Sequence, residues 1–168
     1  PDNNTLTSAT VSITAGFAST EDVLNFTPNS TNFGNIALTS YANGVLTLTS
    51  AGGTATLAQW QAALRSVTYS NTSQDPITTA RTVSVLIYDG ASNSNAIDNT
   101  INITAVNDAP TITVAPSSFT VNEDVAGNLT FTGTPFADID STSLTVTLSV
   151  TDGTINGVTV AGITIGGT

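Results

Sequence analysis

Residues 105–110, Ala105-Val106-Asn107-Asp108-Ala109-Pro110, set the domain plan of this chain. Runs rich in threonine and β-branched apolar residues lie on both sides, at 100–104 and 111–114. Asn107 and Asp108 offer oxygen ligands, while Pro110 fixes its own φ and favours an extended Ala109. An extended segment with such oxygens between two β runs predicts a calcium-stiffened linker, residues 106–110, between tandem domains.

Composition excludes several classes of function. The 168 residues carry a formal net charge of −10, and the only cations are Arg65 and Arg81, which are expected to neutralise nearby carboxylates. Without a basic patch, binding to nucleic acid or to an anionic membrane surface is excluded. The chain has no cysteine and no histidine, which excludes thiolate or imidazole catalysis and Cys/His zinc sites. No apolar run is long enough to span a bilayer, so membrane insertion is not expected.

Alternating apolar and polar residues predict a mostly β chain. Residues 9–14, Ala-Thr-Val-Ser-Ile-Thr, have the period of a strand with one buried face. Asn43-Gly44 lies between two further β runs, 35–39 and 45–49, and indicates a two-residue hairpin turn. Other strands are expected at 23–27, 66–69, 82–88 and 97–104.

One short helix is expected, at about residues 57–64. Thr56 before it is a suitable N-cap. The apolar residues that share one helical face are Leu57, Trp60, Ala63 and Leu64. At this spacing, Trp60 is expected to close the end of a β-sandwich rather than to stack on a sugar. The predicted fold class is therefore all-β, with tandem β-sandwiches and this one helix.

The sequence also contains part of an internal repeat. Asp140, three small polar residues and Leu144 precede an alternating run to Val150, and similar residue types run from Asp2 to Ile13. The alternation at 144–150 predicts a strand. We expect residues 1–105 to form one sandwich repeat that lacks its N-terminal strands. Residues 111–168 are expected to be the start of a second, truncated repeat.

Several motifs follow one another in order over residues 2 to 110. Besides the linker segment, they are Ser8–Thr14, Glu21–Phe26, Gly44–Thr49 and Ala55–Asn71. Together they resemble bacterial cadherin-like repeats of the chondroitin-sulfate-proteoglycan type, which occur in large surface or secreted proteins such as VCBS- and RTX-like adhesins. Ala105 replaces the first Asp of that family's linker. Residues 111–168 are similar to the start of a related Ig-like repeat.

The resemblance implies cadherin- or Ig-like sandwiches that bind Ca²⁺ at repeat junctions. Asp2 matches the second Asp of an Asp-x-Asp pair, Asp89 a late Asp that faces the N-terminal junction, and Glu123 an early Glu that faces the C-terminal one. Asn107 and Asp108 match the linker motif. Asp138 and Asp140 match the Asp-x-Asp pair of the following domain. The metal ligands implied by position are Asn107, Asp108, Asp138, Asp140, Asp2, Asp89 and Glu123.

Paired carboxylates have more than one interpretation. Calcium takes six to eight oxygens at about 2.3–2.6 Å, and carboxylates are common among them. A solvated acidic loop is the alternative for Asp138 and Asp140. Two carboxylates also act as acid and base in glycosidases. Neither this pair nor Glu21 and Asp22 is accompanied by a cluster of aromatic residues, so no enzymatic activity is expected.

The expected function is mechanical. The chain is predicted to be a non-catalytic, extracellular repeat that acts as a calcium-stiffened spacer or adhesive segment of a large bacterial surface protein, beside neighbouring copies of the same repeat family. One alternative is a subunit of a self-assembling filament, sheath or S-layer, whose partner is a second copy. The other is a calcium-dependent carbohydrate-binding module, whose partners are surface glycans.

Overall fold

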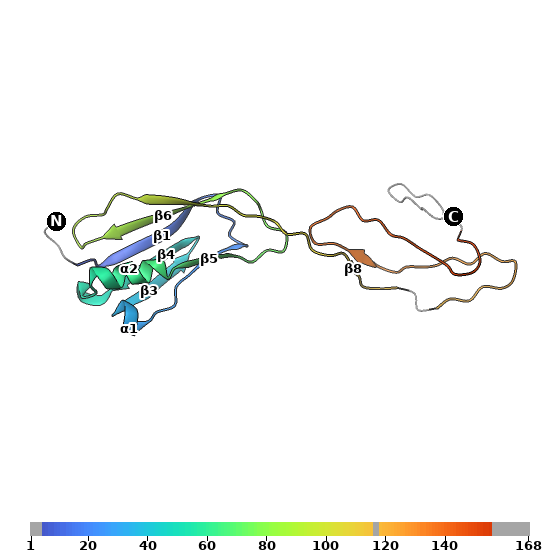
Figure 1. Ribbon diagram of the computed structural model, residues 1–168, viewed down its shortest axis with the longest axis horizontal. Coiled ribbons are helices and arrows are strands. Elements are labelled where there is room, and N and C mark those ends of the chain that lie inside the picture. The colour runs from blue at the N-terminus through green and yellow to red at the C-terminus, as the bar shows by residue number, and fades with distance from the viewer. Residues whose placement is uncertain (1–4, 116–117, 156–168) are drawn as a thin grey trace. The chain divides into compact units, whose positions relative to one another are not determined.

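The chain divides into two compact units, Pro1–Val106 and Asn107–Thr168. A computed structural model describes residues 5–115 and 118–155 (Figure 1). The division falls inside the segment 106–110 that the sequence indicates as a linker. Asp2, one of the implied metal ligands, lies outside the described residues.

The first unit is built on two antiparallel sheets, which confirms the prediction of a mostly β chain (Figure 1). The larger sheet has the strand order β3-β4-β1-β6-β7, and the smaller sheet pairs β2 with β5. The strands of the larger sheet are β1 (Ser8–Ala15), β3 (Ile36–Ala42), β4 (Val45–Ser50), β6 (Arg81–Tyr88) and β7 (Ile97–Ile101). The smaller sheet consists of β2 (Asp22–Asn25) and β5 (Thr68–Asn71).

Strand β1 lies in the middle of the larger sheet. Its side chains alternate between buried and partly exposed, and the buried ones face the core. Val11 lies opposite Leu46 of β4 and Val85 of β6. Full burial of a side chain such as Leu46 stabilises the fold by about 1.5–3 kcal/mol. The buried apolar side chains form one cluster: Ala9, Val11, Ile13, Leu24, Phe26, Phe33, Ile36, Leu46, Leu48, Ala55, Trp60, Ala63 and Val83.

The hairpin between β3 and β4 turns at Asn43-Gly44, as predicted. Both residues have positive φ, 51° and 73°, and a type I′ turn requires this of its two central residues. A side chain at position 44 would also collide with Phe17, because an added Cβ would lie 2.8 Å from the ring. Both the positive φ and the close approach of Phe17 therefore favour glycine at this position.

The predicted helix is α2 (Leu57–Arg65). Thr56 and Gln59 form a capping box, in which each side chain accepts the other residue's backbone N–H. Trp60 is 1% exposed, and its Nε1 donates to the carbonyl of Leu6 at 3.1 Å. Leu57, expected on the buried face, is 50% exposed because the packed part of that face begins one turn later.

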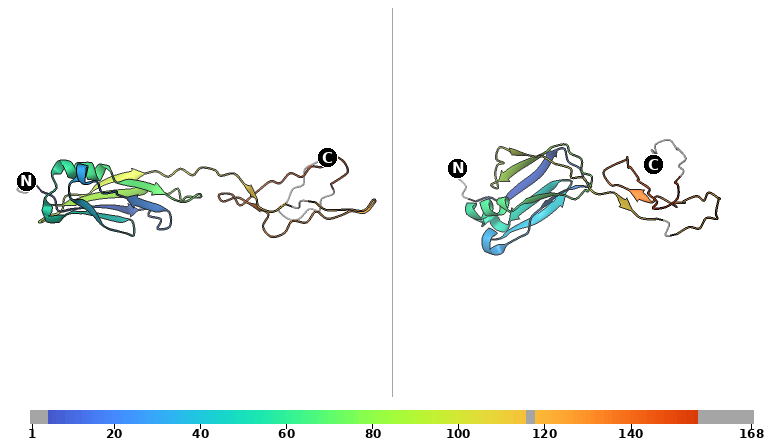
Figure 2. Two further views of the ribbon diagram at one scale, coloured as in Figure 1. Left: turned by 90° about the horizontal axis from the view of Figure 1, so that it is seen from below. Right: turned by 45° about the vertical axis from the view of Figure 1, so that its right-hand side comes forward.

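Two shorter helical turns accompany α2. They are α1 (Ser30–Phe33) and the 3₁₀ turn η1 (Ala51–Gly53). Helices α1 and α2 contact each other and lie side by side in Figure 2. Phe33 of α1 is buried and stacks at a tilt on Phe26, with 5.6 Å between the ring centroids. None of the helices within residues 5–115 and 118–155 has the length and hydrophobicity that a membrane span needs.

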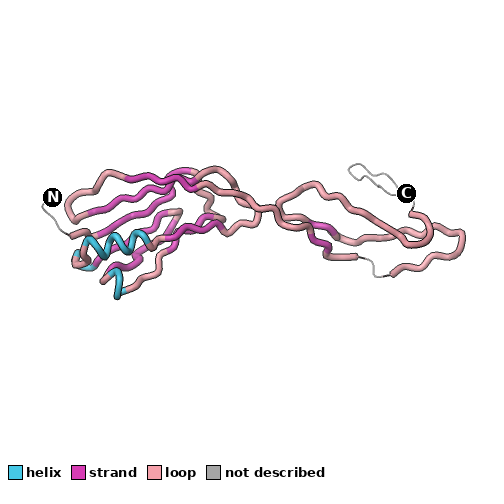
Figure 3. The backbone as a smooth tube through the Cα atoms, viewed as in Figure 1, coloured by secondary structure: helices cyan, strands magenta, loops and turns pink. Residues whose placement is uncertain are grey.

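The second unit has little paired strand in its described part. Its paired strands there are β8 (Thr111–Ile112) and β9 (Phe136–Ala137), and Figure 3 shows the segments around them as loop. The predicted strand at 144–150 is wrong for this structure, because no described segment pairs with it. Alternation predicts which side chains share a face, whereas a strand also needs a hydrogen-bonded neighbour.

Replacing Trp60 with alanine tests how α2 contributes to the core. The change should lower the free energy of unfolding of the first unit by about 3–5 kcal/mol, since it leaves a large buried cavity. Leu57→Ala, in the same helix but half exposed, should cost less than half as much. Denaturant unfolding followed by far-UV circular dichroism measures both. Equal losses would show that the helix does not present Trp60 to the core.

Candidate metal centre

Two aspartates of the second unit lie in the loop that follows β9. The backbone N–H of Asp140 donates to Asp138 Oδ1 at 3.2 Å, so the chain turns between the two residues. The two carboxyl groups interact, because each affects the pKa of the other. This short turn therefore gathers two carboxyl groups from neighbouring positions in the sequence.

The linker segment meets the same loop. The backbone N–H of Asp108 donates to Asp140 Oδ2 at 2.8 Å. Asp108 shortly precedes β8 and Asp138 directly follows β9, so the antiparallel pairing of Thr111 with Ala137 brings both segments to one end of the strand pair. Next to Asp108, the Asn107 side chain is turned back on the backbone, where its Nδ2 donates to the Asp108 carbonyl at 2.6 Å.

The pKa values of the two carboxyl groups in this loop are shifted in opposite directions. A hydrogen bond with the Asp140 carboxyl raises the pKa of Asp138, and burial adds to the effect. The pKa of Asp140 is lowered, chiefly because its carboxylate accepts the N–H of Asp108. The Oδ1 atom of Asp140 is buried and has no hydrogen-bond partner within the described residues. An oxygen in that state is available to a cation.

This arrangement offers a hard cation two carboxylates. Within residues 5–115 and 118–155, no group of three or more Asp, Glu, His or Cys is gathered that could hold a metal. Calcium prefers six to eight oxygens. Asp138 and Asp140 would therefore bind calcium only together with backbone carbonyls, the Asn107 amide oxygen or water.

Within the described part of the second unit, Asp108 and Glu123 do not form a group of three acidic side chains with this pair. Asp89 lies in the first unit after β6, and its side chain accepts two backbone N–H groups of the following turn at 2.8 and 2.7 Å. Glu123 lies in an exposed turn between β8 and β9. Asp108 reaches the pair through its backbone N–H. The roles of these side chains as metal ligands, like that of Asp2, stay predictions.

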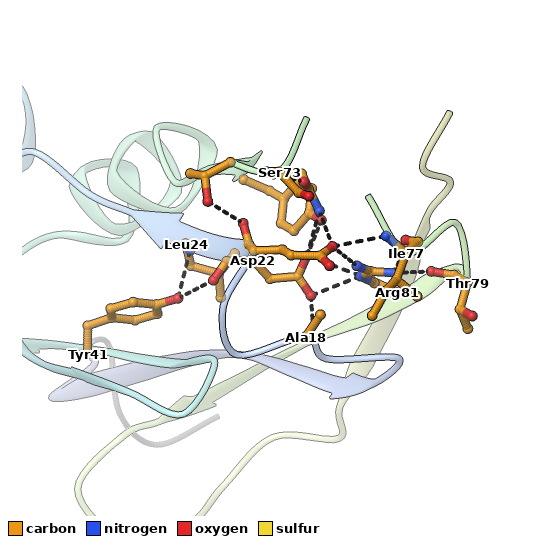
Figure 4. A network of polar contacts seen from close by, with 12 residues as sticks. Ala18, Asp22, Leu24, Tyr41, Ser73, Ile77, Thr79 and Arg81 are labelled. Atoms are coloured by element: carbon orange, nitrogen blue, oxygen red, sulfur yellow. Dashed lines mark hydrogen bonds and ion pairs between the residues drawn. The ribbon is translucent and has the colours of Figure 1, made fainter. Parts of the chain in front are cut away.

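A second cluster of charged groups lies inside the first unit (Figure 4). We call Glu21, Asp22, Tyr69, Asn71 and Arg81 the Arg81 cluster. Arg81 begins β6, and its Nε donates to Asp22 Oδ2 at 2.9 Å, while its Nη2 lies 3.5 Å from Glu21 Oε2. The side chains of Arg81 and Asp22 are both 0% exposed. The pair is therefore fully buried, and it joins β6 of the larger sheet to β2 of the smaller sheet.

Neutral donors complete the surroundings of Asp22. Tyr69 donates its hydroxyl at 2.6 Å, and the backbone N–H of Ala18 donates at 2.7 Å. Burial by itself raises the pKa of Asp22, but the hydrogen bonds from Arg81, Ala18 and Tyr69 outweigh burial, so that this pKa is lowered. The hydrogen bond to Asp22 raises the pKa of Arg81. Burial raises the pKa of Tyr69, and the hydrogen bond from its hydroxyl to Asp22 raises it further.

The two arginines have different roles. The prediction that they neutralise carboxylates is confirmed for Arg81. It is wrong for Arg65, which is exposed at the end of α2 and has no ion-pair partner in the described part of the chain. The alternation of β6 carried a signal, because position 81 shares its phase with the buried Val83. The partner could not be read from the sequence, since Asp22 lies 59 residues away.

Comparisons with protein-family models, curated protein sequences and solved structures found no match to this chain. The likeness to cadherin-like repeats therefore depends on the sequence motifs alone. Independently of that likeness, the structure brings the backbone of Asp108 together with Asp138 and Asp140.

Acidification should destabilise the first unit through Asp22. Because its pKa is lowered on folding, the stabilisation is complete above the pKa of an unfolded aspartic acid, about 3.9. It is lost as the pH falls through the lower pKa of the folded state. Denaturant unfolding followed by the fluorescence of Trp60, the one tryptophan of the chain, should show this loss below about pH 4.

Asp22→Asn should remove this part of the pH dependence. At neutral pH it should also lower the free energy of unfolding by about 3–5 kcal/mol, because the buried Arg81 loses its closest carboxylate. Asp75→Asn replaces an exposed carboxylate of the same unit and serves as the control. A pH profile of Asp22→Asn that runs parallel to that of the wild type would contradict the expectation.

Proposed function

We propose that this chain is a non-catalytic repeat segment of a bacterial surface or secreted protein, and that calcium held through Asp138 and Asp140 stiffens its linker. In this proposal the ion ties residues 106–110 to the loop after β9. The linker then loses its freedom to bend, and successive repeats act as a spacer or adhesive segment. The two units are, on the same proposal, cadherin- or Ig-like β-sandwiches.

The observation that carries this proposal is the contact between the linker and the Asp-x-Asp loop. Asp108 and Asp140 are 32 residues apart, yet an N–H of one donates to the carboxylate of the other at 2.8 Å. A cation at the buried Oδ1 of Asp140 would satisfy an atom that has no partner within the described residues. It would also offset the negative charge of the two neighbouring carboxyl groups, whose hydrogen bond raises the pKa of Asp138.

The small number of carboxylates sets the expected affinity. Calcium sites of extracellular modules have dissociation constants of about 10⁻⁴–10⁻³ M, and affinity falls with fewer charged ligands. A site built on Asp138 and Asp140 belongs in this weak range. Such a site fills only where calcium is abundant, which supports an extracellular location.

Calorimetric titration tests the metal centre directly. We expect calcium to bind the wild-type chain with a dissociation constant of about 10⁻⁴–10⁻³ M. Asp140→Asn should weaken this binding by about tenfold or more, because it removes the carboxylate that faces both Asp138 and the linker. The measurement is the heat of binding at fixed pH and ionic strength.

Asp152→Asn is the matched control, since it removes an exposed carboxylate from the same unit. It should bind calcium as the wild type does. An absence of binding heat in the wild type would remove the calcium proposal. Equal binding by Asp140→Asn and the wild type would place the ion somewhere else.

Self-assembly is a second candidate function, favoured by the apolar surface of the second unit. In its described part, Ile112, Val125 and Ile139 are 69%, 60% and 59% exposed. Residues 144–150 alternate like a strand but have no strand partner there. A strand from a second copy of the chain would supply the missing hydrogen bonds and cover such side chains.

Sedimentation velocity over a range of concentrations tests this candidate. Self-association should grow with concentration in the wild type, and Leu148→Lys should reduce it several-fold by placing a charge on the apolar phase of residues 144–150. Thr147→Lys, one residue away in the opposite phase, is the control and should change association less. A wild type that stays monomeric at all concentrations would exclude this candidate.

A further inference from the structure

The oxygens around Arg81 are of the types found in calcium sites. Its Nε lies 2.9 and 3.1 Å from the two oxygens of Asp22, and its Nη2 lies 3.5 Å from Glu21 Oε2. Its Nη1 donates to the backbone carbonyl of Ile77 at 2.8 Å and to that of Thr79. Two carboxylates and two carbonyls of one loop are a ligand set that calcium commonly takes.

These contacts hold a loop that has no helix or strand of its own, residues 72–80 (Figure 4). Glu21 fixes it as well, because Glu21 Oε2 accepts the N–H of Ile77 at 3.1 Å and the side chain of Asn71 at 3.1 Å. Near its end the loop lies against Gly16, where an added Cβ would collide with the carbonyl of Ala80. The Arg81 cluster therefore fixes the backbone of this loop at Ile77 and Thr79 through hydrogen bonds.

We propose that the guanidinium of Arg81 is a built-in cation that takes the place of a metal ion between Glu21, Asp22 and the loop 72–80. The cation is attached to β6 by its own side chain, so a chelator cannot remove it. The loop 72–80 then keeps its structure at any calcium concentration. This inference concerns the first unit alone and does not depend on the metal centre proposed for the second.

Removal of the guanidinium should convert the cluster into a metal site. Glu21 and Asp22 would remain buried without a positive charge, an arrangement that is strongly unfavourable. The carbonyls of Ile77 and Thr79 would lose their donor, and the volume of the side chain would become free. Calcium accepts irregular sets of oxygens of this kind, whereas magnesium demands near-ideal octahedral geometry.

The test compares three full-length proteins that all carry Asp140→Asn, so that the metal centre proposed for the second unit does not contribute. They are this parent, Arg81→Ala and Arg65→Ala. Arg65→Ala removes the same charge from an exposed position and is the matched control. Thermal unfolding is followed by Trp60 fluorescence, which reports on the first unit, in EDTA, calcium chloride or magnesium chloride.

The parent and Arg65→Ala should each melt at the same temperature in EDTA and in calcium. Arg81→Ala should melt at a lower temperature in EDTA and recover in proportion to the logarithm of the calcium concentration. Magnesium should have little effect. Terbium in place of calcium should give several-fold stronger emission on excitation of the protein in Arg81→Ala than in the parent, because Tyr69 donates to Asp22 beside the proposed ion.

Two results would overturn the proposal. One is a parent whose Trp60 transition moves down when EDTA is added, since a built-in cation cannot be chelated. The other is an Arg81→Ala protein whose transition calcium does not move. Should Arg81→Ala fail to fold at every calcium concentration, Arg81→Gln takes its place with the same two outcomes, since it removes the charge, keeps much of the volume and adds an amide oxygen.

Discussion

The ion pair between Arg81 and Asp22 links the two sheets of the first unit. Arg81 is the first residue of β6 in the larger sheet, and Asp22 is the first residue of β2 in the smaller one. Both side chains are fully buried, so breaking the pair leaves an uncompensated charge at a cost of about 3–5 kcal/mol. Tyr41 of β3 adds a neutral link, because its hydroxyl donates to the Asp22 carbonyl at 3.2 Å.

Local features of the first unit were predictable because local physics decides them. The alternation of residues 9–14 gives β1, the need for positive φ gives the Asn43-Gly44 turn, and the cap at Thr56 gives the start of α2. For Arg81 the sequence predicted a carboxylate partner but not burial, although position 81 shares the apolar phase of β6. The particular partner was not predictable, because pairing with Asp22 depends on how two separate sheets come together.

In the second unit, too, local features were predictable from the sequence and contacts between distant segments were not. The spacing of Asp138 and Asp140 is local, and the structure shows the turn between them. Their meeting with Asp108 was expected only from the resemblance to cadherin-like repeats, since it needs β8 to pair with β9 across the chain. The run at 144–150 failed as a strand because a period of two selects a face, and hydrogen-bonded neighbours decide whether a strand forms.

The positions of the two arginines explain why the two carboxylate clusters differ. Glu21 and Asp22 are neutralised within their own unit by Arg81. Residues 107–168 contain no lysine, arginine or histidine, so that unit has no side-chain cation for Asp138 and Asp140. The positive charge that would offset these two carboxylates can come only from protons or from a cation in solution, and the hydrogen bond with the Asp140 carboxyl raises the pKa of Asp138. The first unit thus supplies the positive charge for its own two carboxylates, whereas the second unit contains no cationic side chain that could do so.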